Sequence, residues 1–352
     1  MRLLMITRKV DKLDGQTGFV FNWIGKLSKR VKNIKIICLE RGDVSGLPNN
    51  VKVFSMGKEK GKNRLKEFIR FQIGILKFIF KVDGVFCHQN PIYTIILYPW
   101  AKISRKKIVA WYAHKEVNWQ VRMMNFMADK IITSSEAGFQ IDSPKRIVIG
   151  QGIDINQFTP DLKRIKLKKE WIKIISVGRI SKIKNYETLI EAADILKKYG
   201  LSFKINIVHQ SINVKDKDQI NYFNKLMKMI REKDLSSYIK FIGEIPNIAL
   251  VEQYRLSDVA VNLCPDGAPD KAGLEAMACG LPLLVCNKTF VKDFGHYSVQ
   301  LTFEEKNPED LAEKFLNLIK CGNFEEIGKY LRKQVEKNHN LDNLLDYIIK
   351  CF

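Results

Sequence analysis

A group of basic residues follows a short apolar run near the middle of the chain. Residues 173–177 could form a buried strand that ends at Gly178, and Arg179, Lys182 and Lys184 follow before a helical pattern begins. Cations at the carboxyl end of a parallel strand, beside the start of a helix, are well placed to bind a diphosphate. Arg179 could hold phosphate oxygens through two parallel hydrogen bonds, whereas Lys184 would add a point charge. Taken alone, the segment is also compatible with a solvated basic turn.

A second segment, residues 262–282, combines a Gly/Pro/Asp loop with a short apolar helix that stops at Gly280. The loop glycines let the backbone approach a ligand closely, and the free amides of the first helical turn can hydrogen-bond a phosphate. Glu275 lies inside this helix, where a lone carboxylate needs hydrogen-bond donors. The two hydroxyls of a ribose would supply them. The alternative is an internal pairing with a nearby Lys or Arg.

Short apolar runs alternate with helical patterns along the chain, which predicts parallel sheets with helical crossovers. We therefore expect an α/β protein with two Rossmann-like, doubly wound domains and a ligand site in the cleft between them. The expected strands are residues 3–6, 34–39, 82–87, 107–112, 130–133 and 146–149, and then 173–177, 204–208, 238–242, 259–263 and 283–286.

The length of the chain also indicates two domains, because 352 residues exceed the size at which one hydrophobic core usually keeps growing. The join is expected within residues 152–160, where Gly-Ile-Asp and a Thr-Pro turn precede the basic stretch 163–169. We accordingly place an N-terminal domain at residues 1–158 and a C-terminal domain at residues 159–335.

The two chemical segments, taken in this order, resemble the retaining GT-B glycosyltransferases of the family 4 type, also called glycosyl transferases group 1. Gly178-Arg179 with Lys184-Asn185 resembles the donor-phosphate pair of that family. Residues 274–282 (Leu-Glu-Ala-Met-Ala-Cys-Gly-Leu-Pro) resemble its ribose-binding helix. Residues 150–160 resemble its domain crossing, and residues 241–245 resemble the segment before its nucleotide pocket. Four motifs that agree in sequence and spacing make the resemblance specific.

The resemblance implies an enzyme that moves a sugar from a nucleoside diphosphate donor to a glycan or lipid-linked acceptor, as in polysaccharide biosynthesis. It implies retention of the anomeric configuration, no metal, and no cofactor apart from the donor as co-substrate. Arg179 and Lys184 would bind the diphosphate, Glu275 would hold the ribose, and backbone at Glu244 and Ile245 would face the base. The final helix, about residues 336–352, would pack back onto the N-terminal domain.

Two positions in the N-terminal half take part in the same resemblance. Gly18 resembles the second glycine of the family's N-terminal loop, and Thr17 stands where the first glycine is usual. His114 resembles the active-site histidine near the transferred sugar, although Lys115 follows it instead of the frequent Asp. A histidine there could orient a sugar hydroxyl or transfer a proton. Without the resemblance, a structural role is the simpler interpretation.

The chain departs from the family at the acidic residue that precedes the ribose carboxylate in many members, because Gly267 occupies that position. We predict that Asp270, or backbone amides in residues 268–273, take over contact with the donor sugar. The candidate catalytic residues are therefore His114, Arg179, Lys184 and Asp270. The candidate donor-binding residues are Gly18, Gly178, Arg179, Lys184, Glu244, Ile245, Gly267, Ala268, Lys271, Ala272, Gly273, Leu274 and Glu275.

The chain is strongly basic, with 59 Lys and Arg against 38 Asp and Glu, a formal net charge of +21. The resulting positive field suits nucleotide phosphates, an anionic membrane or nucleic acid. Residues 58–81 interleave eight basic residues with phenylalanines, and the stretch 92–100 is apolar; both would suit peripheral contact with an anionic membrane. A crossover helix packed on its own sheet is the simpler interpretation of residues 58–81. No zinc finger, RNA-binding signature or terminal basic tail occurs, so nucleic acid is not an expected partner.

The remaining features predict a cytoplasmic protein, located at the inner face of the cell membrane if the membrane contact holds. The seven cysteines include no C-x-x-C pair, and the N-terminus is apolar for too few residues to be a signal peptide. The sequence Asp216-Lys-Asp218 spells the D-x-D of metal-dependent transferases, but its Lys-rich loop favours a surface position. Gly267 leaves one alternative open, a GT-B protein that binds nucleotide sugars without activity. A basic nucleic-acid-binding protein is a second.

Overall fold

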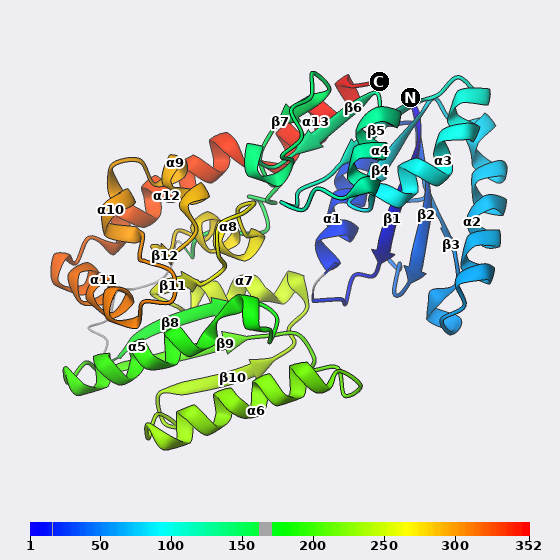
Figure 1. Ribbon diagram of the computed structural model, residues 1–352. Coiled ribbons are helices and arrows are strands. Elements are labelled where there is room, and N and C mark those ends of the chain that lie inside the picture. Colours follow the sequence, from blue (N-terminus) through cyan, green and yellow to red (C-terminus); the bar gives the residue numbers. More distant parts are fainter. Residues whose placement is uncertain (16, 162–170) are drawn as a thin grey trace. The chain divides into compact units, whose positions relative to one another are not determined.

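The computed structural model describes residues 1–15, 17–161 and 171–352, and the chain divides into two compact α/β units (Figure 1). Unit 1 comprises residues 1–154 and 339–352, and unit 2 comprises residues 155–338. The predicted domain limits were 158/159 and 335/336. The basic stretch 163–169 lies outside the described residues.

Unit 1 is built on a parallel seven-stranded sheet with the order β3-β2-β1-β4-β5-β6-β7. Its apolar runs form strands because both faces of the sheet are covered by helices. The six strands predicted for this half are present. β3 was missed, because its sequence, Val-Lys-Val-Phe-Ser, is short and only partly apolar. The strands are β1 (Arg2–Val10), β2 (Asn33–Arg41), β3 (Val51–Ser55), β4 (Gly84–His88), β5 (Lys107–Trp111), β6 (Lys130–Thr133) and β7 (Arg146–Val148).

Helices α2 (Arg64–Phe78), α3 (Pro91–Ile103) and α4 (Trp119–Met127) share one hydrophobic core on one face of this sheet. Helices α1 (Gly18–Ser28) and α13 (Leu341–Lys350) share the core on the other face. The C-terminal helix therefore packs within unit 1, whereas residues 336–338 belong to unit 2. Short 3₁₀ turns occupy Lys58–Lys60, Ile79–Lys81 and Glu136–Gly138.

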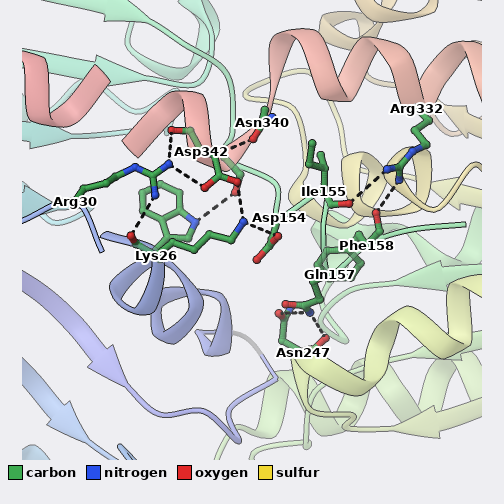
Figure 2. Close-up of polar contacts among 12 residues, drawn as sticks. Lys26, Arg30, Asp154, Ile155, Gln157, Phe158, Asn247, Arg332, Asn340 and Asp342 are labelled. Carbon is green, nitrogen blue, oxygen red and sulfur yellow. Dashed lines mark hydrogen bonds and ion pairs between the residues drawn. The ribbon is translucent and has the colours of Figure 1, made fainter. Parts of the chain in front are cut away.

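Ion pairs fix α13 to α1 at the end of unit 1 where the chain leaves it. Figure 2 shows the Lys26 ammonium between Asp154, at 2.9 Å, and Asp342, at 2.8 Å. Arg30 contacts the same Asp342 at 2.9 Å and Asp346 at 2.6 Å. Asp154 is the last residue of the first segment of unit 1, so Lys26 joins the end of that segment to the C-terminal helix.

Unit 2 is built on a parallel five-stranded sheet with the order β10-β9-β8-β11-β12. All five predicted strands are present, as β8 (Ile172–Val177), β9 (Phe203–Val208), β10 (Ile239–Gly243), β11 (Val259–Asn262) and β12 (Leu283–Val285). The helices are α5 (Tyr186–Lys198), α6 (Lys217–Glu232), α7 (Asn247–Arg255), α8 (Lys271–Ala278), α9 (Val291–Phe294), α10 (Ser298–Leu301), α11 (Pro308–Cys321) and α12 (Phe324–Asn338), and 3₁₀ turns occupy Lys182–Lys184, Lys288–Phe290 and Gly295–Tyr297.

The acidic motif at residues 216–218 has a local structural role. Asp216 is the N-cap of α6 and accepts a hydrogen bond from the backbone N–H of Gln219 at 3.1 Å. Both Asp216 and Asp218 are exposed, so the predicted surface position is confirmed. In the described part of the chain, no helix has the length and apolar character needed to cross a bilayer.

Candidate functional site

The two segments selected from the sequence meet at one edge of the unit 2 sheet. Strands β8 and β11 are parallel neighbours, so the residues after their carboxyl ends lie close together. Gly178 and Arg179 follow β8, and the loop after β11 leads to Asp270 and α8 (Figure 1). The Lys184 ammonium forms an ion pair with the Asp270 carboxylate in this position.

Asp270 is the centre of a small polar network. Its Oδ2 also accepts hydrogen bonds from Asn262 Nδ2 at 3.0 Å and from Cys264 Sγ at 2.9 Å. Its Oδ1 accepts from the backbone N–H of Ala272 at 3.2 Å, which makes Asp270 the N-cap of α8. Asp270 therefore joins the basic loop after β8, the end of β11 and the start of α8.

Opposing effects act on the pKa values of this pair. Burial alone would raise the pKa of Asp270, but the Lys184 ammonium and the hydrogen bonds from Cys264 and Asn262 hold it well below its usual range. Burial alone would lower the pKa of Lys184, but the Asp270 charge raises it well above its usual range. Both groups are charged at neutral pH as a result.

Backbone geometry lets Lys184 reach this position. A Cβ at Gly178 would lie 2.7 Å from Cε of Lys184, so only glycine leaves room for the lysine side chain as it lies here. Asn185, which precedes α5, has a φ of 43° and turns the chain from the Lys182–Lys184 turn into the helix. The dipeptides Gly178-Arg179 and Lys184-Asn185 therefore belong to one structural unit, the connection between β8 and α5.

Arg179 differs from Lys184 in its environment. Its side chain is exposed, and it makes no hydrogen bond or ion pair with the residues that the structure describes. Lys182 is exposed in the same turn. The sequence assigned both cations to the diphosphate, with a bidentate contact from Arg179 and a point charge from Lys184. The structure adds a difference in environment, because the Arg179 guanidinium faces solvent and the Lys184 ammonium is paired with Asp270.

Glu275 is buried in α8 with an exposed fraction of only 4%. Its carboxylate accepts hydrogen bonds from the side chains of Tyr254, at 3.5 Å, and Asn247. Burial raises its pKa, and the Lys271 ammonium on the same helix partly opposes this effect. Lys271 therefore lies near enough to act electrostatically on Glu275, and the carboxylate also has two donors from α7 that the sequence did not reveal.

Asn247 extends this network, because its backbone carbonyl and its Oδ1 accept hydrogen bonds from Gln157 Nε2 at 3.0 and 3.2 Å (Figure 2). Gln157 belongs to the segment at the start of unit 2. The pattern of α7 offered no sequence signal for this role, since Asn247 simply opens an ordinary helix.

The loop before α8 and the first turn of α8 provide backbone more than side chains. Gly267 and Ala268 are partly exposed. A Cβ at Gly273 would lie 3.0 Å from Phe290, so a larger residue would disturb the packing of α8. The Leu274 side chain is fully buried. Like the glycines, Leu274 can therefore offer a ligand only its backbone groups.

The Glu244 carboxylate, just after β10, is exposed and accepts hydrogen bonds from the backbone and hydroxyl of Ser211, which follows β9. Ile245 is partly exposed beside it. β8, β9 and β10 are parallel, and β9 pairs with both of the others. The contact between Glu244 and Ser211 therefore lies on the side of the sheet where β8 also has its carboxyl end.

The two predicted residues of unit 1 have local contacts of their own. Gly18 begins α1, and its N–H donates to the Asp14 carbonyl at 2.9 Å. His114 is exposed after β5, its N–H donates to the Gly138 carbonyl at 2.8 Å, and its Nδ1 accepts from the Glu116 N–H at 3.2 Å. Within the described ranges, no group of three or more His, Cys, Asp or Glu side chains could hold a metal ion.

Residues 158–339 match the model of the family described as glycosyl transferases group 1. The chain belongs to this family. The match includes the whole Lys184–Asp270 network and Glu275. Among curated relatives, the chain is 25% identical over 201 residues to a D-inositol 3-phosphate glycosyltransferase of Geodermatophilus obscurus. The aligned region covers 53% of this chain and 44% of the relative. The chain is 24% identical over 144 residues to a mannosylfructose-phosphate synthase of Agrobacterium fabrum, which covers 39% and 32%.

Solved structures agree over almost the entire chain. HepE of Anabaena, in complex with UDP and glucose, superposes with a TM-score of 0.79 at 15% identity and covers 99% of this chain and 98% of its own. A sucrose-phosphate synthase of Thermosynechococcus elongatus gives a TM-score of 0.77 at 14% identity, with coverage of 99% and 98%. These structures confirm the predicted α/β fold of the GT-B type. The matches to the curated relatives span less than half of those proteins.

Proposed function

We propose that this protein is a glycosyltransferase that binds a nucleoside diphosphate sugar in unit 2 and transfers the sugar to a glycan or lipid-linked acceptor. Membership of the glycosyl transferases group 1 family supports sugar transfer. HepE, whose fold is similar, was crystallised with UDP and glucose, which supports a nucleotide sugar as the donor.

The observation that carries the proposal is the arrangement of Arg179, Lys184 and Asp270 at the strand ends. An ammonium group has three donor hydrogens. The ion pair with Asp270 holds the Lys184 ammonium in place and leaves it donor hydrogens for an anionic ligand. Arg179 lies in the same turn with its guanidinium exposed. Two cations of different geometry beside the start of α8 suit a diphosphate.

We propose that these cations act on the leaving group. When the bond between the sugar and the diphosphate breaks, negative charge grows on the diphosphate, and preorganised cations and amide dipoles stabilise it. Arg179, Lys184 and the first N–H groups of α8 would supply this stabilisation. Glu275 would accept the ribose hydroxyls through the carboxylate that Tyr254 and Asn247 hold in position.

The finer features follow from the family resemblance and are part of the proposal. They are retention of the anomeric configuration, independence of metal, a donor-sugar contact from Asp270 or the amides of residues 268–273, a catalytic role for His114 near the transferred sugar, and a role for Gly18 in donor binding. His114→Ala should then lower kcat while donor affinity stays unchanged. NMR spectroscopy of the product would report its anomeric configuration.

Calorimetric titration with UDP-, GDP-, ADP- and dTDP-sugars tests the donor site. We expect one nucleotide class to bind the wild type and to bind Glu275→Ala much more weakly. Transfer to an acceptor mixture, followed by mass spectrometry with and without EDTA, tests the reaction. Donor binding by neither protein would contradict the proposal.

A nucleotide-sugar-binding protein without transfer activity is a second candidate, and one observation favours it. Gly267 provides no carboxylate, and the Asp270 carboxylate is engaged with Lys184, Asn262 and Cys264. Selective donor binding without hydrolysis or transfer would support this second function.

A further inference from the structure

Helix α2 has an apolar face that its own unit does not cover. Phe71, Ile75 and Phe78 point into the core beneath the helix. On the other side, Leu65 is 69% exposed and Ile73 is 51% exposed. One side of the helix packs on the sheet, as the simpler interpretation of residues 58–81 predicts, and the other side is an exposed apolar surface.

The exposed apolar residues of α2 and the turn that follows form one continuous stripe. Apart from the adjacent Phe68 and Ile69, they recur at intervals of three or four residues, which places them along one side of a helix. All of them are between 47% and 69% exposed. We call this set the α2 stripe; it comprises Leu65, Phe68, Ile69, Ile73, Leu76 and Phe80.

Cations border the α2 stripe. Lys66 and Lys77 lie one position after Leu65 and Leu76, on the flank of the stripe, and both are exposed. Glu59, one of the two acidic residues of this segment, accepts hydrogen bonds from the Ser55 hydroxyl. In the described part of the chain, none of the exposed cations of this border makes an ion pair; they are Lys60, Lys62, Arg64, Lys66, Lys77 and Lys81.

The neighbouring helix layer continues the same surface chemistry. Helix α3 packs against both α2 and α4, so the three helices form one layer over the sheet of unit 1 (Figure 1). On α4, Trp119 is 63% and Phe126 is 71% exposed, and the exposed Arg122 lies between them on the same side. The apolar stretch 92–100 was wrongly grouped with this surface, because Tyr93, Leu97 and the partly buried Ile96 pack into the core.

We propose that the outer side of the α2–α4 layer docks on an anionic membrane surface, with the α2 stripe inserted among the lipid head groups and its border cations in contact with lipid phosphates. Apolar residues along one side of a helix gain free energy when they enter the interface, and adjacent Lys and Arg add attraction to anionic lipid. The unpaired cations favour an anionic bilayer over an uncharged protein surface. This inference concerns unit 1 alone and does not depend on the donor site of unit 2.

Co-sedimentation of the full chain with phosphatidylcholine vesicles, with and without phosphatidylglycerol, tests the proposal. We expect strong binding only in the presence of phosphatidylglycerol and a decrease of binding as salt concentration rises. The double variant Ile69→Ser/Leu76→Ser should weaken binding about tenfold or more, since each change removes several interfacial methylene groups. Lys62→Glu/Lys66→Glu should weaken binding to the anionic vesicles without an effect on the melting temperature, because both side chains are exposed.

Two matched controls separate this face from the overall charge and apolarity of the chain. Lys217→Glu/Lys240→Glu makes the same change of net charge at exposed positions of unit 2, and Tyr199→Ser/Val214→Ser removes exposed apolar groups there. Both should bind vesicles like the wild type. Equal binding to neutral vesicles, or equal losses in the controls, would overturn the proposal. So would a wild-type dimer in analytical ultracentrifugation that Ile69→Ser/Leu76→Ser converts to monomer, because a second copy would then occupy the stripe.

Discussion

The Lys184 ammonium and the Asp270 carboxylate form an ion pair although the two residues are 86 positions apart in the chain. Their side chains are only 13% and 19% exposed. The pair exists because β8 and β11 are adjacent parallel strands, so a loop after one strand meets the helix start after the other. Asp270 also caps α8, so the same carboxylate positions the cation and the helix.

Removal of both partners should destabilise unit 2 by less than the sum of the two single removals. Asp270→Asn leaves the Lys184 charge buried without its counterion and should lower the free energy of unfolding by about 3 kcal/mol. Lys184→Met should have a similar effect on Asp270. The double variant should lose clearly less than the sum of the two, because neither charge remains unpaired. Urea unfolding followed by circular dichroism measures the cycle; additive losses would show that the pair contributes no coupling.

Arg179→Met should weaken donor binding without a change in stability. The guanidinium is exposed and has no partner in the described part of the chain, so the free energy of unfolding should change by no more than about 0.5 kcal/mol. Loss of charged hydrogen bonds to a diphosphate should raise the Kd for the donor about tenfold or more. Lys182→Met removes an equal charge from the same turn and is the matched control in the calorimetric titration. Equal effects of the two variants would indicate that the donor is attracted by the overall positive charge of the turn and not by a specific contact between Arg179 and a phosphate.

Glu275→Gln should remove a pH dependence of stability. Burial raises the pKa of Glu275 above its unfolded value despite Lys271, so the folded state binds more protons than the unfolded state between these two pKa values. The free energy of unfolding contributed by this group is therefore complete below the ordinary pKa of about 4.3 and falls as pH rises towards neutral.

Urea unfolding of the wild type and the variant between about pH 4 and pH 7 measures this effect. Because glutamine does not titrate, Glu275→Gln should show a smaller decrease across the range. Glu309→Gln, at an exposed position of α11, should parallel the wild type. A decrease of the same size in Glu275→Gln would assign the pH dependence to another group.

The fold could be predicted well from the sequence because each buried parallel strand is a short apolar run between helical patterns. β3 escaped notice because Lys52 interrupts its run and the strand lies at the edge of the sheet. The site residues could be selected, since Arg179, Lys184, Asp270 and Glu275 stand out by type and context. Their pairing could not be predicted, because it depends on which strands are neighbours.

Helix α2 and the turn that follows it illustrate a second limit of sequence periodicity. Phe71 and Phe78 face the core, whereas Phe68 and Phe80 face outward, although all four belong to one apolar pattern. A helix that is apolar on two sides gives no sequence signal for which side packs on the sheet. The core of unit 1 decides this, since the space between α2 and the sheet accepts only one side of the helix.

Arg332 anchors the segment that begins unit 2, and its loss should destabilise that unit. Its guanidinium donates to the carbonyls of Ile155 at 3.4 Å and Phe158 at 3.0 Å (Figure 2), and also to the carbonyl of Ala278 at the end of α8. Arg332→Met leaves these carbonyls without their donor and should lower the free energy of unfolding by about 2–3 kcal/mol. Arg332→Lys should recover only part of this loss, because an ammonium lacks the planar fork that reaches several carbonyls at once.

Lys329→Met provides the control for this prediction on the same helix. Lys329 is 72% exposed and pairs only with Glu325, at 2.7 Å, among the described residues. An exposed pair of this kind contributes little, so the variant should unfold within about 0.5 kcal/mol of the wild type. Urea unfolding of the three variants measures the difference. If Arg332→Met matched Lys329→Met, the three carbonyl contacts would contribute nothing to the stability of unit 2, and the start of the unit would be held by packing of Phe158 against Tyr254 instead.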